Sequence, residues 1–385
     1  MISTTAVEPT DSFRALGSSP DSRALEHRWM LLQERGEHSY FQSWGWIGTW
    51  LECVAPRTSI RLLQAGDDAN PRALALIGTG TGKRPFIRSR QLRVTETGLS
   101  DVDALTIEHN GLLLGGDGQE ASALNAALRA LRADPKWDEI VISALASERV
   151  ELYERCAREQ GLTARRMLEV PHFTIDLEAV RRSREGFLEL LSSNSRAQVR
   201  RAVRGLESSG PIHVTRARDL KETLEFFDRL AAIHQAYWQQ RGQPGAFHSD
   251  FARAFHHRLI STRYPTGEID LLRVSAGPGD VAYLYNFVYR GRALNYQSGI
   301  VYTGAAKEKP GLVAHCAVVA ELAARGLQTY DLLMGSQQYK RTLGTDRGLM
   351  VWLHLQRPRL RFWLEHNARA IRDRARALKT ASVAD

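Results

Sequence analysis

The stretch that decides the fold begins with Ile269-Asp270-Leu271-Leu272-Arg273-Val274 and runs to Lys340. Two more β-patterned runs, Val281 to Tyr289 and Ala293 to Tyr302, follow the first. Next come Lys307-Glu308-Lys309-Pro310-Gly311, an alanine-rich helical segment, and a strand that leads into Gly335-Ser336-Gln337-Gln338-Tyr339-Lys340. Three strands, a helix and a further strand in this order predict an α/β unit with helices packed on a sheet.

The basic loop before the helical segment has the features of a phosphate site. Pro310 suits the first position of a helix, and Gly311 lets the backbone approach a ligand closely. The first turn of a helix has unpaired N–H groups, and the helix dipole favours an anion there. We therefore expect phosphate groups to be held by Lys307, Lys309, Pro310, Gly311 and Leu312.

The first half of the chain repeats this pattern. The runs at 60–65 and 73–78 correspond to those at 269–274 and 281–289, with a turn rich in glycine, proline and aspartate in each half. A helical segment at 119–133 followed by a strand at 137–143 then corresponds to a helix at 310–325 and a strand at 327–333. Two copies of one α/β unit account for a length of 385 residues.

The expected organisation has four parts. Residues 1–24 are a disordered polar tail, 25–180 a first and degenerate unit, 181–356 a second unit, and 357–385 a basic helix and tail. Each unit has a mixed central sheet covered by helices, which include segments at 41–53 and 220–241. The alternating run from Val170 to Leu177 is expected to close the first unit's sheet, and the C-terminal helix to pack outside the second unit.

Composition excludes several classes of protein. The chain is 43% hydrophobic and 25% charged, as in globular proteins, and no apolar run approaches the ~18 residues of a membrane span. The three cysteines, Cys53, Cys156 and Cys316, lie far apart without a CxxC pair, so we expect neither a zinc site nor disulfides. No metal is expected, and the predicted location is the cytoplasm, with possible peripheral contact at the inner face of the membrane.

The net charge of +9 is concentrated in two segments. Residues 181–220 hold nine arginines against four acidic residues, and residues 357–379 hold eight basic residues against two. Local basicity of this kind indicates either solvated helix faces or two surfaces that meet an anionic partner. Phosphates of coenzyme A, an anionic membrane and tRNA are the partners considered.

Polar and aromatic side chains in the second half predict a ligand pocket. The strands of the hairpin are rich in tyrosine and amide side chains, and tyrosine hydroxyls need partners when their rings are buried. The following strand carries Asp331, a costly carboxylate if buried, and passes into Tyr339 and Lys340. Ligands of α/β proteins tend to bind beyond the carboxyl ends of strands. The predicted catalytic residues are therefore Asp331, Tyr339 and Lys340.

These stretches resemble a known family. Residues 190–358 resemble the CelD-like branch of the GNAT superfamily of acyltransferases, often met in exopolysaccharide and cellulose gene clusters, which is similar to the Fem-type peptidyltransferases with two fused GNAT units. The segments that carry the resemblance are Ser192-Ser193-Asn194-Ser195-Arg196, Trp238-Gln239-Gln240-Arg241-Gly242, Tyr285-Asn286-Phe287-Val288-Tyr289-Arg290-Gly291, Lys309-Pro310-Gly311, and Tyr330-Asp331 with Gly335 and Tyr339-Lys340. The first half resembles the family's N-terminal unit through Phe41-Gln42-Ser43-Trp44-Gly45-Trp46.

The resemblance implies two tandem GNAT units and direct transfer of an acetyl or longer acyl group from acyl-CoA to an amine or a sugar hydroxyl. The acceptor would be a small molecule, sugar or peptide, in exopolysaccharide or cell-envelope synthesis. The expected substrate-binding residues are Tyr285, Asn286, Tyr296, Gln297, Ser298, Arg196 and Trp238.

Two alternatives stay open. Many GNAT enzymes carry a pyrophosphate loop of the form Arg/Gln-x-x-Gly-x-Gly/Ala, whereas this chain has only Lys307-Glu308-Lys309-Pro310-Gly311. The donor is then either an acyl-CoA or, as in the Fem group, an aminoacyl-tRNA that meets the 181–218 arginines. The other alternative is a non-catalytic GNAT-fold adaptor at the membrane surface.

Overall fold

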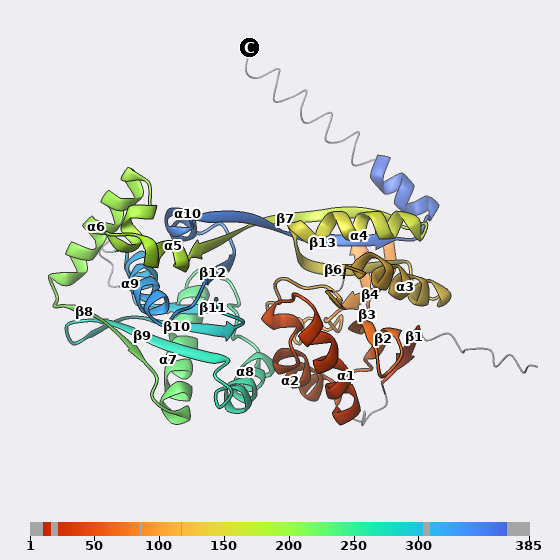
Figure 1. The fold of residues 1–385 in the computed structure, drawn as a ribbon, viewed down its shortest axis with the longest axis horizontal. Helices are drawn as coiled ribbons and strands as arrows, with labels where there is room; N and C mark the ends of the chain where they lie inside the picture. The colour runs from red at the N-terminus through yellow and green to blue at the C-terminus, as the bar shows by residue number, and fades with distance from the viewer. Residues whose placement is uncertain (1–10, 17–21, 85–86, 117, 303–308, 368–385) are drawn as a thin grey trace, which may run out of the picture.

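A computed structural model describes residues 11–16, 22–84, 87–116, 118–302 and 309–367 (Figure 1). The first half contains α1 (Ser22–Arg35), η1 (Tyr40–Gln42), α2 (Trp44–Val54), α3 (Glu120–Ala133) and α4 (Ser147–Glu159). The helices of the second half are α5 (Leu177–Arg182), η2 (Gly186–Leu190), α6 (Ser193–Glu207), α7 (Leu220–Gln239), α8 (Asp250–Arg263), α9 (Pro310–Ala324) and α10 (Gln338–Leu343). Residues 360–367 are also helical.

All the described strands belong to one mixed sheet of 13 strands. The first half contributes β1 (Ser12–Ala15), β2 (Arg61–Gly66), β3 (Pro71–Arg84), β4 (Ile87–Val94), β5 (Leu113–Leu114), β6 (Glu139–Ala146) and β7 (Thr163–Asp176). The second half contributes β8 (Ile212–Arg216), β9 (Ile269–Ala276), β10 (Gly279–Tyr289), β11 (Arg292–Ile300), β12 (Thr329–Met334) and β13 (Asp346–Gln356). The strand order is β1-β2-β3-β4-β6-β13-β7-β12-β11-β10-β9-β8, with β5 beside β3.

The predicted internal repeat is present. The same order of nine helices and strands occurs in each half. In the first half it is α1, α2, β2, β3, β4, α3, β6, α4, β7, and in the second it is α7, α8, β9, β10, β11, α9, β12, α10, β13. In both copies the third strand, β4 or β11, pairs in parallel with the strand after the helix, β6 or β12. The fold is therefore a mixed α/β fold of two tandem units, as expected, but the two sheets are joined into one.

The last strands of the two units are exchanged. β7 pairs antiparallel with β12 of the second unit, and β13 pairs antiparallel with β6 of the first. β7 and β13 also pair with each other along eleven positions and run side by side between the halves (Figure 1). This corrects two expectations: the strand at 170–177 does not close the first unit's sheet, and residues 346–356 belong to the sheet of the first half.

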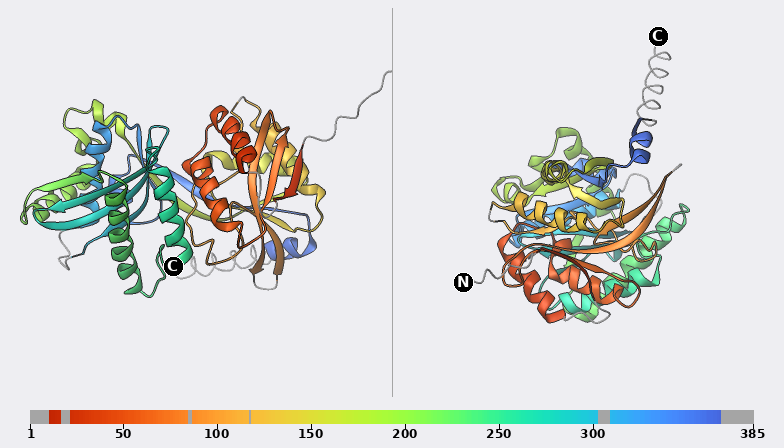
Figure 2. Two further views of the ribbon diagram at one scale, coloured as in Figure 1. Left: turned by 90° about the horizontal axis from the view of Figure 1, so that it is seen from below. Right: turned by 90° about the vertical axis from the view of Figure 1, so that its right-hand side faces the viewer.

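Helices cover both faces of the sheet. On one face α1 and α2 of the first half meet α7 and α8 of the second, so one aromatic core crosses the boundary between the halves (Figure 2). Trp46 contacts Phe255 with ring centroids 4.9 Å apart and Phe287 with centroids 5.7 Å apart. On the opposite face α3 and α4 cover the first half, and α6 and α9 the second. The shared core and the exchanged strands hold the halves in one body.

Local sequence explains the element boundaries near the site. Arg290 and Gly291 both have positive φ angles, 47° and 74°, as a tight two-residue turn between β10 and β11 requires. α9 starts with Pro310 and stops before Gly326, whose φ of 82° breaks the helix. Asp219 caps α7 by accepting a hydrogen bond from the Glu222 N–H. The helix expected at 41–53 begins later, at Trp44.

Both ends of the chain differ from expectation. Residues 1–24 are not a disordered tail throughout, because Ser12–Ala15 pairs with β2 and α1 begins at Ser22. The C-terminal helix lies on the first half and not outside the second, because β13 ends there. In the described part of the chain, none of the helices is long and apolar enough to cross a membrane.

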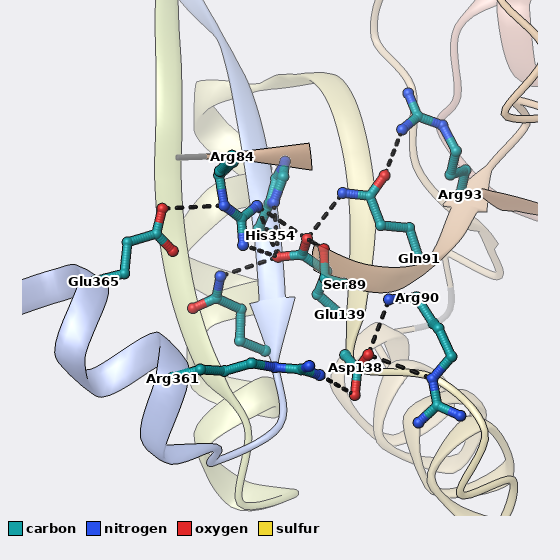
Figure 3. Close-up of polar contacts among 11 residues, drawn as sticks. Arg84, Ser89, Arg90, Gln91, Arg93, Asp138, Glu139, His354, Arg361 and Glu365 are labelled. Carbon is teal, nitrogen blue, oxygen red and sulfur yellow. Dashed lines mark hydrogen bonds and ion pairs between the residues drawn. The ribbon is translucent and has the colours of Figure 1, made fainter. Parts of the chain in front are cut away.

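A buried carboxylate network fixes this C-terminal helix to the first half (Figure 3). Glu139 of β6 is fully buried and accepts hydrogen bonds from five side chains: Arg84, Ser89, Gln91, His354 and Gln356. Burial alone would raise the pKa of Glu139, but these donors lower it far below its usual value. Arg84 also pairs with Glu365 at 3.0 Å, and Arg361 pairs with Asp138 at 2.5 Å. All charges of the network are paired, so we assign it a structural role.

Candidate functional site

The site lies where two neighbouring strands of the second half diverge. β11 and β12 pair in parallel over only three positions, from Arg292 with Thr329 to Leu294 with Asp331. Beyond this point the register of β12 shifts against β7, and Leu333 takes a left-handed conformation with φ of 59°. The strands separate, and a cavity of about 220 Å³ opens between their carboxyl ends. We call it the second-half cavity.

The cavity is lined by residues of both halves. From the second half come His234, Tyr237, Asn295, Tyr296, Gln297, Ser298, Ile300, Tyr302, Leu333, Met334, Gln337, Tyr339 and Lys340. The first half contributes Thr106 and Glu108 from the loop before β5. Five predicted site residues, Tyr296, Gln297, Ser298, Tyr339 and Lys340, are therefore brought together. Sequence reasoning missed Glu108.

Glu108 and Lys340 place opposite charges on the buried wall of the cavity. Glu108 Oε2 accepts a hydrogen bond of 2.6 Å from the Met334 N–H, and only 4% of the residue is exposed. Burial raises the pKa of Glu108, while Lys340 partly offsets the rise. The Lys340 ammonium donates to the carbonyls of Leu333 and Met334, and burial lowers its pKa. A carboxylate with a raised pKa beside a ligand cavity is a candidate general base.

Tyr339 provides a hydroxyl at the same cavity. Its ring stacks on His315 of α9 with centroids 4.5 Å apart, and burial raises the pKa of Tyr339 above its usual value. His315 bonds to the Tyr330 hydroxyl at 2.9 Å, and burial lowers the pKa of His315 to about 3. Tyr339 is therefore a neutral O–H group at physiological pH, held by a neutral histidine.

The start of α9 lies next to β11. Lys309 is the N-cap residue, exposed and left-handed with φ of 42°, and Pro310 occupies the first helical position. The Leu312 and Val313 N–H groups bond back to the Lys309 carbonyl. A Cβ at Gly311 would make an ordinary contact of 3.6 Å with Ile300, so packing within the protein does not require glycine there. The predicted phosphate residue Lys307 lies outside the described residues.

Four of the predicted substrate-binding residues do not line the cavity. Tyr285 and Asn286 are fully buried: Tyr285 packs in the aromatic core, and Asn286 accepts a hydrogen bond from Asn295. The side of β10 that carries Tyr285 faces α7 and α8 and not a pocket. Arg196 of α6 donates a hydrogen bond to the Leu191 carbonyl, and Trp238 packs on His234 near the end of α7.

Asp331 is fully buried behind the cavity in an ion network. Its two carboxylate oxygens contact His172 at 2.8 Å, His109 at 3.0 Å and Arg292 at 3.3 Å, and accept the Leu333 N–H. Burial would raise the pKa of Asp331, but His172 and His109 lower it well below its usual value. Asp331, predicted to be catalytic, does not line the second-half cavity, and its described contacts are with these side chains and the Leu333 N–H.

Three of these residues, His109, His172 and Asp331, are of the types that bind metal ions. Ligand atoms of His109, His172 and Asp331 lie within 4.8 Å of one another. Both carboxylate oxygens, however, already accept hydrogen bonds from protein groups, and Arg292 supplies a positive charge. The geometry is that of a satisfied ion network that joins the loop before β5 to β7, β11 and β12.

A second, larger cavity of about 420 Å³ lies on the other side of this network. His109, Arg292, Leu294 and Glu148 are among its lining residues. Glu108 lines the second-half cavity and His109 lines the larger one, so consecutive residues of one loop separate the two spaces.

Known protein families and solved structures were compared with this chain. Residues 193–341 match the model of the acetyltransferase (GNAT) domain family. No curated protein matches the chain. Three solved structures share the fold over most of their length, all at low sequence identity.

FemX matches with a TM-score of 0.54 and 10% identity over 85% of this chain and 95% of FemX. The C-terminal domain of a protein named as a lysylphosphatidylglycerol synthetase from Agrobacterium fabrum matches with a TM-score of 0.53 and 10% identity, over 92% of this chain and 96% of the domain. L-PGS from Bacillus licheniformis matches with a TM-score of 0.52 and 12% identity, over 86% and 92% of the two chains. At such identities the likeness shows the fold alone. Residues 193–341 are thus similar to the acetyltransferase (GNAT) domain, and the whole chain has a tandem fold similar to that of FemX.

Proposed function

We propose that this protein is an acyl-CoA-dependent N-acyltransferase whose reaction takes place in the second-half cavity. The observation that carries the proposal is the buried pair of Glu108 and Lys340 on the wall of a cavity between diverging strands, with Tyr339 beside it. General base, cation and neutral hydroxyl are the groups that direct acyl transfer from a thioester requires.

The donor would enter along β11 with its phosphates toward the start of α9. The Gly311 N–H, which has no hydrogen-bond partner among the described residues, and the Lys309 side chain offer a donor and a positive charge there. Bound acyl-CoA would supply the activated thioester. Its carbonyl oxygen would meet the edge of β11 beyond Leu294, which pairs with no described strand on the β12 side. Backbone N–H groups on such an edge are suited to stabilise an oxyanion.

The chemistry is a direct transfer. The acceptor amine attacks the carbonyl carbon, and Glu108 takes the proton that the nitrogen loses. As the carbon–sulfur bond breaks, Tyr339 donates its hydroxyl proton to the sulfur. Lys340 holds the carbonyls of the strand end in place and partly offsets the rise that burial causes in the pKa of Glu108. No cysteine or serine nucleophile is needed.

Asp331 has a positioning role in this proposal. It fixes His109, the neighbour of Glu108 in the chain, from a distance of 3.0 Å. The acceptor identity, the acyl length, the CelD-like branch and a role in exopolysaccharide synthesis stay predictions.

Donor binding is the first test. Thermal unfolding should be measured with CoA and with acyl-CoAs of increasing length, because a ligand at 100 times its Kd stabilises a protein by about 2.7 kcal/mol. We expect a shift of several degrees that Lys309→Glu reduces and that the matched change Lys136→Glu, at an exposed lysine of the first half, does not. Absence of a shift with every CoA would refute an acyl-CoA donor, and salt-sensitive tRNA binding would then support the aminoacyl-tRNA alternative.

Turnover is the second test. Release of free CoA thiol should be followed with a panel of amines and amino sugars. Formation of an N-acyl product at a rate above hydrolysis would support the proposal, whereas donor binding without transfer to any nucleophile would favour the adaptor alternative.

A further inference from the structure

The C-terminal helix at residues 360–367 presents two different faces. Phe362 is buried, Arg361 pairs with Asp138, and Glu365 pairs with Arg84, so these residues face the protein (Figure 3). The opposite face carries Leu360, Trp363 and Leu364, which are 72%, 61% and 53% exposed. They are three of the seven large hydrophobic residues exposed in the described chain.

The spacing of these residues makes one continuous apolar patch. Positions i, i+3 and i+4 lie on the same side of a helix. A patch that includes an exposed tryptophan is costly in water and marks an interaction surface. The helix itself cannot swing away freely, because the ion pairs of Arg361 and Glu365 fix its inner face to Asp138, just before β6, and to Arg84 of β3. Its apolar face is therefore held outward.

The charge around the patch indicates the chemistry of its partner. Residues 357–379 hold eight basic side chains against two acidic ones. Arg359 lies one residue before Leu360, 3.9 Å from the Asp138 carboxylate, and 44% of its side chain stays exposed. A tryptophan and leucines framed by arginines are typical of helices that lie in the interface of an anionic membrane, where the rings enter the headgroup layer and the guanidinium groups meet phosphates.

We infer that this helix is a docking surface for an anionic lipid bilayer, with Leu360, Trp363 and Leu364 inserted at the headgroup level. The surface lies on the first half and would bring the protein to a bilayer without requiring a membrane span. The inference rests on the helix alone and does not depend on the proposed acyl transfer.

Vesicle co-sedimentation of the full chain tests the inference. We expect binding to vesicles that contain phosphatidylglycerol, weak or no binding to pure phosphatidylcholine, and loss of binding as salt rises. The double change Trp363→Ser and Leu364→Ser should weaken binding about tenfold or more, since each buried apolar side chain contributes to interfacial affinity. Both residues are exposed, so folding should be unaffected.

Leu99→Ser is the matched control, because Leu99 is a 40% exposed leucine of the first half outside the patch. Binding that the double variant retains, or that the control loses equally, would overturn the inference. So would equal binding to neutral and anionic vesicles. Concentration-dependent dimerisation that the double variant abolishes, without vesicle binding, would assign the patch to a second copy of the chain instead.

Discussion

The same structural gap occurs in both halves of the molecule, but among the described residues a side chain bridges the two strands only in the first half. In the first half β4 and β6 pair in parallel over three positions, and Ala144 then takes a left-handed φ of 45°. In the second half β11 and β12 also pair over three positions, and Leu333 has a φ of 59°. Both pairs of strands then separate.

The first-half gap is filled by Asn110. Its N–H donates to the Ala144 carbonyl at 3.2 Å, and its side-chain amide donates to the Val94 carbonyl at 2.9 Å and the Ser143 hydroxyl at 3.1 Å. Asn110 thus bonds to both of the separated strands. The second-half gap has no such plug and contains the cavity.

One loop accounts for both outcomes. Thr106 and Glu108 reach across to line the second-half cavity, while Asn110 fills the gap of the first half. The first unit thus lines most of the larger cavity and also provides part of the wall of the second-half cavity. The reaction proposed for the second-half cavity would therefore need both halves.

The largest effect is expected from Glu108→Gln. Removing a general base lowers turnover about 10²- to 10⁴-fold, while the apparent KM for the donor should change little. Burial raises the pKa of Glu108, so the base form appears only above a pH higher than the usual carboxyl value of about 4.3. The wild-type kcat/KM should therefore fall on the acid side as pH drops through this raised pKa, and the variant should lose that limb.

Glu148→Gln is the control, since Glu148 lines the larger cavity on the other side of the ion network. It should retain turnover. If Glu108→Gln keeps its activity and its pH profile, the contribution of the first half is structural only, and the comparison between the halves loses its functional meaning.

Much of the fold could be predicted from sequence because its signals are local. Turn residues and apolar periodicity indicated the hairpin of β10 and β11, the helices α3, α7 and α9, and the repeat itself. The exchange of β7 and β13 could not be predicted, because the pattern of polar and apolar residues in each strand is compatible with a place in the sheet of the first half or of the second. Strand partners depend on long-range pairing, which periodicity does not encode.

The site divides in the same way. Tyr339 and Lys340 were predicted because they follow a strand end, and they line the cavity. Glu108 was not, because it lies in an irregular loop more than 200 residues away, without a motif around it. Tyr285 was misplaced because β10 is covered by helices on its aromatic face. Sequence identifies chemistry near an element's end, but not which distant loop meets it.

A large effect on stability, without one on activity, is expected from Glu139→Ala in the first half. The change leaves Arg84 and His354 without their buried partner, and breaking a buried ion pair costs about 3–5 kcal/mol. Urea unfolding of the variant measures the loss. Its folded fraction should keep wild-type turnover, since the network in Figure 3 lies away from the second-half cavity. Reduced turnover per folded molecule would contradict the separation of roles.

A smaller effect is expected from Asn110→Ala. The substitution leaves the Val94 carbonyl and the Ser143 hydroxyl without this donor, at a cost of about 1–3 kcal/mol in the free energy of unfolding. Calorimetric titration with CoA should still give one site per chain in both proteins. A second site in the variant would show that Asn110 alone separates the two gaps, and two sites in the wild type would refute the comparison.

The smallest effect is a pH dependence of stability from the ion network behind the cavity. Burial alone would lower the pKa of His172, but the charge of Asp331 more than offsets this, and the pKa lies above its usual value of about 6.5. The folded state therefore binds the His172 proton more tightly than the unfolded chain. This stabilisation is complete below about pH 6.5 and is lost as pH rises through the raised pKa. The free energy of unfolding should decline over that range in the wild type and less steeply in His172→Gln. The first half carries Ile142, Ser143 and Ala144 where β6 bends, so no equivalent pH dependence is expected there. If the pH dependence of the free energy of unfolding is the same in His172→Gln as in the wild type, the titrating group lies outside the network that joins the halves.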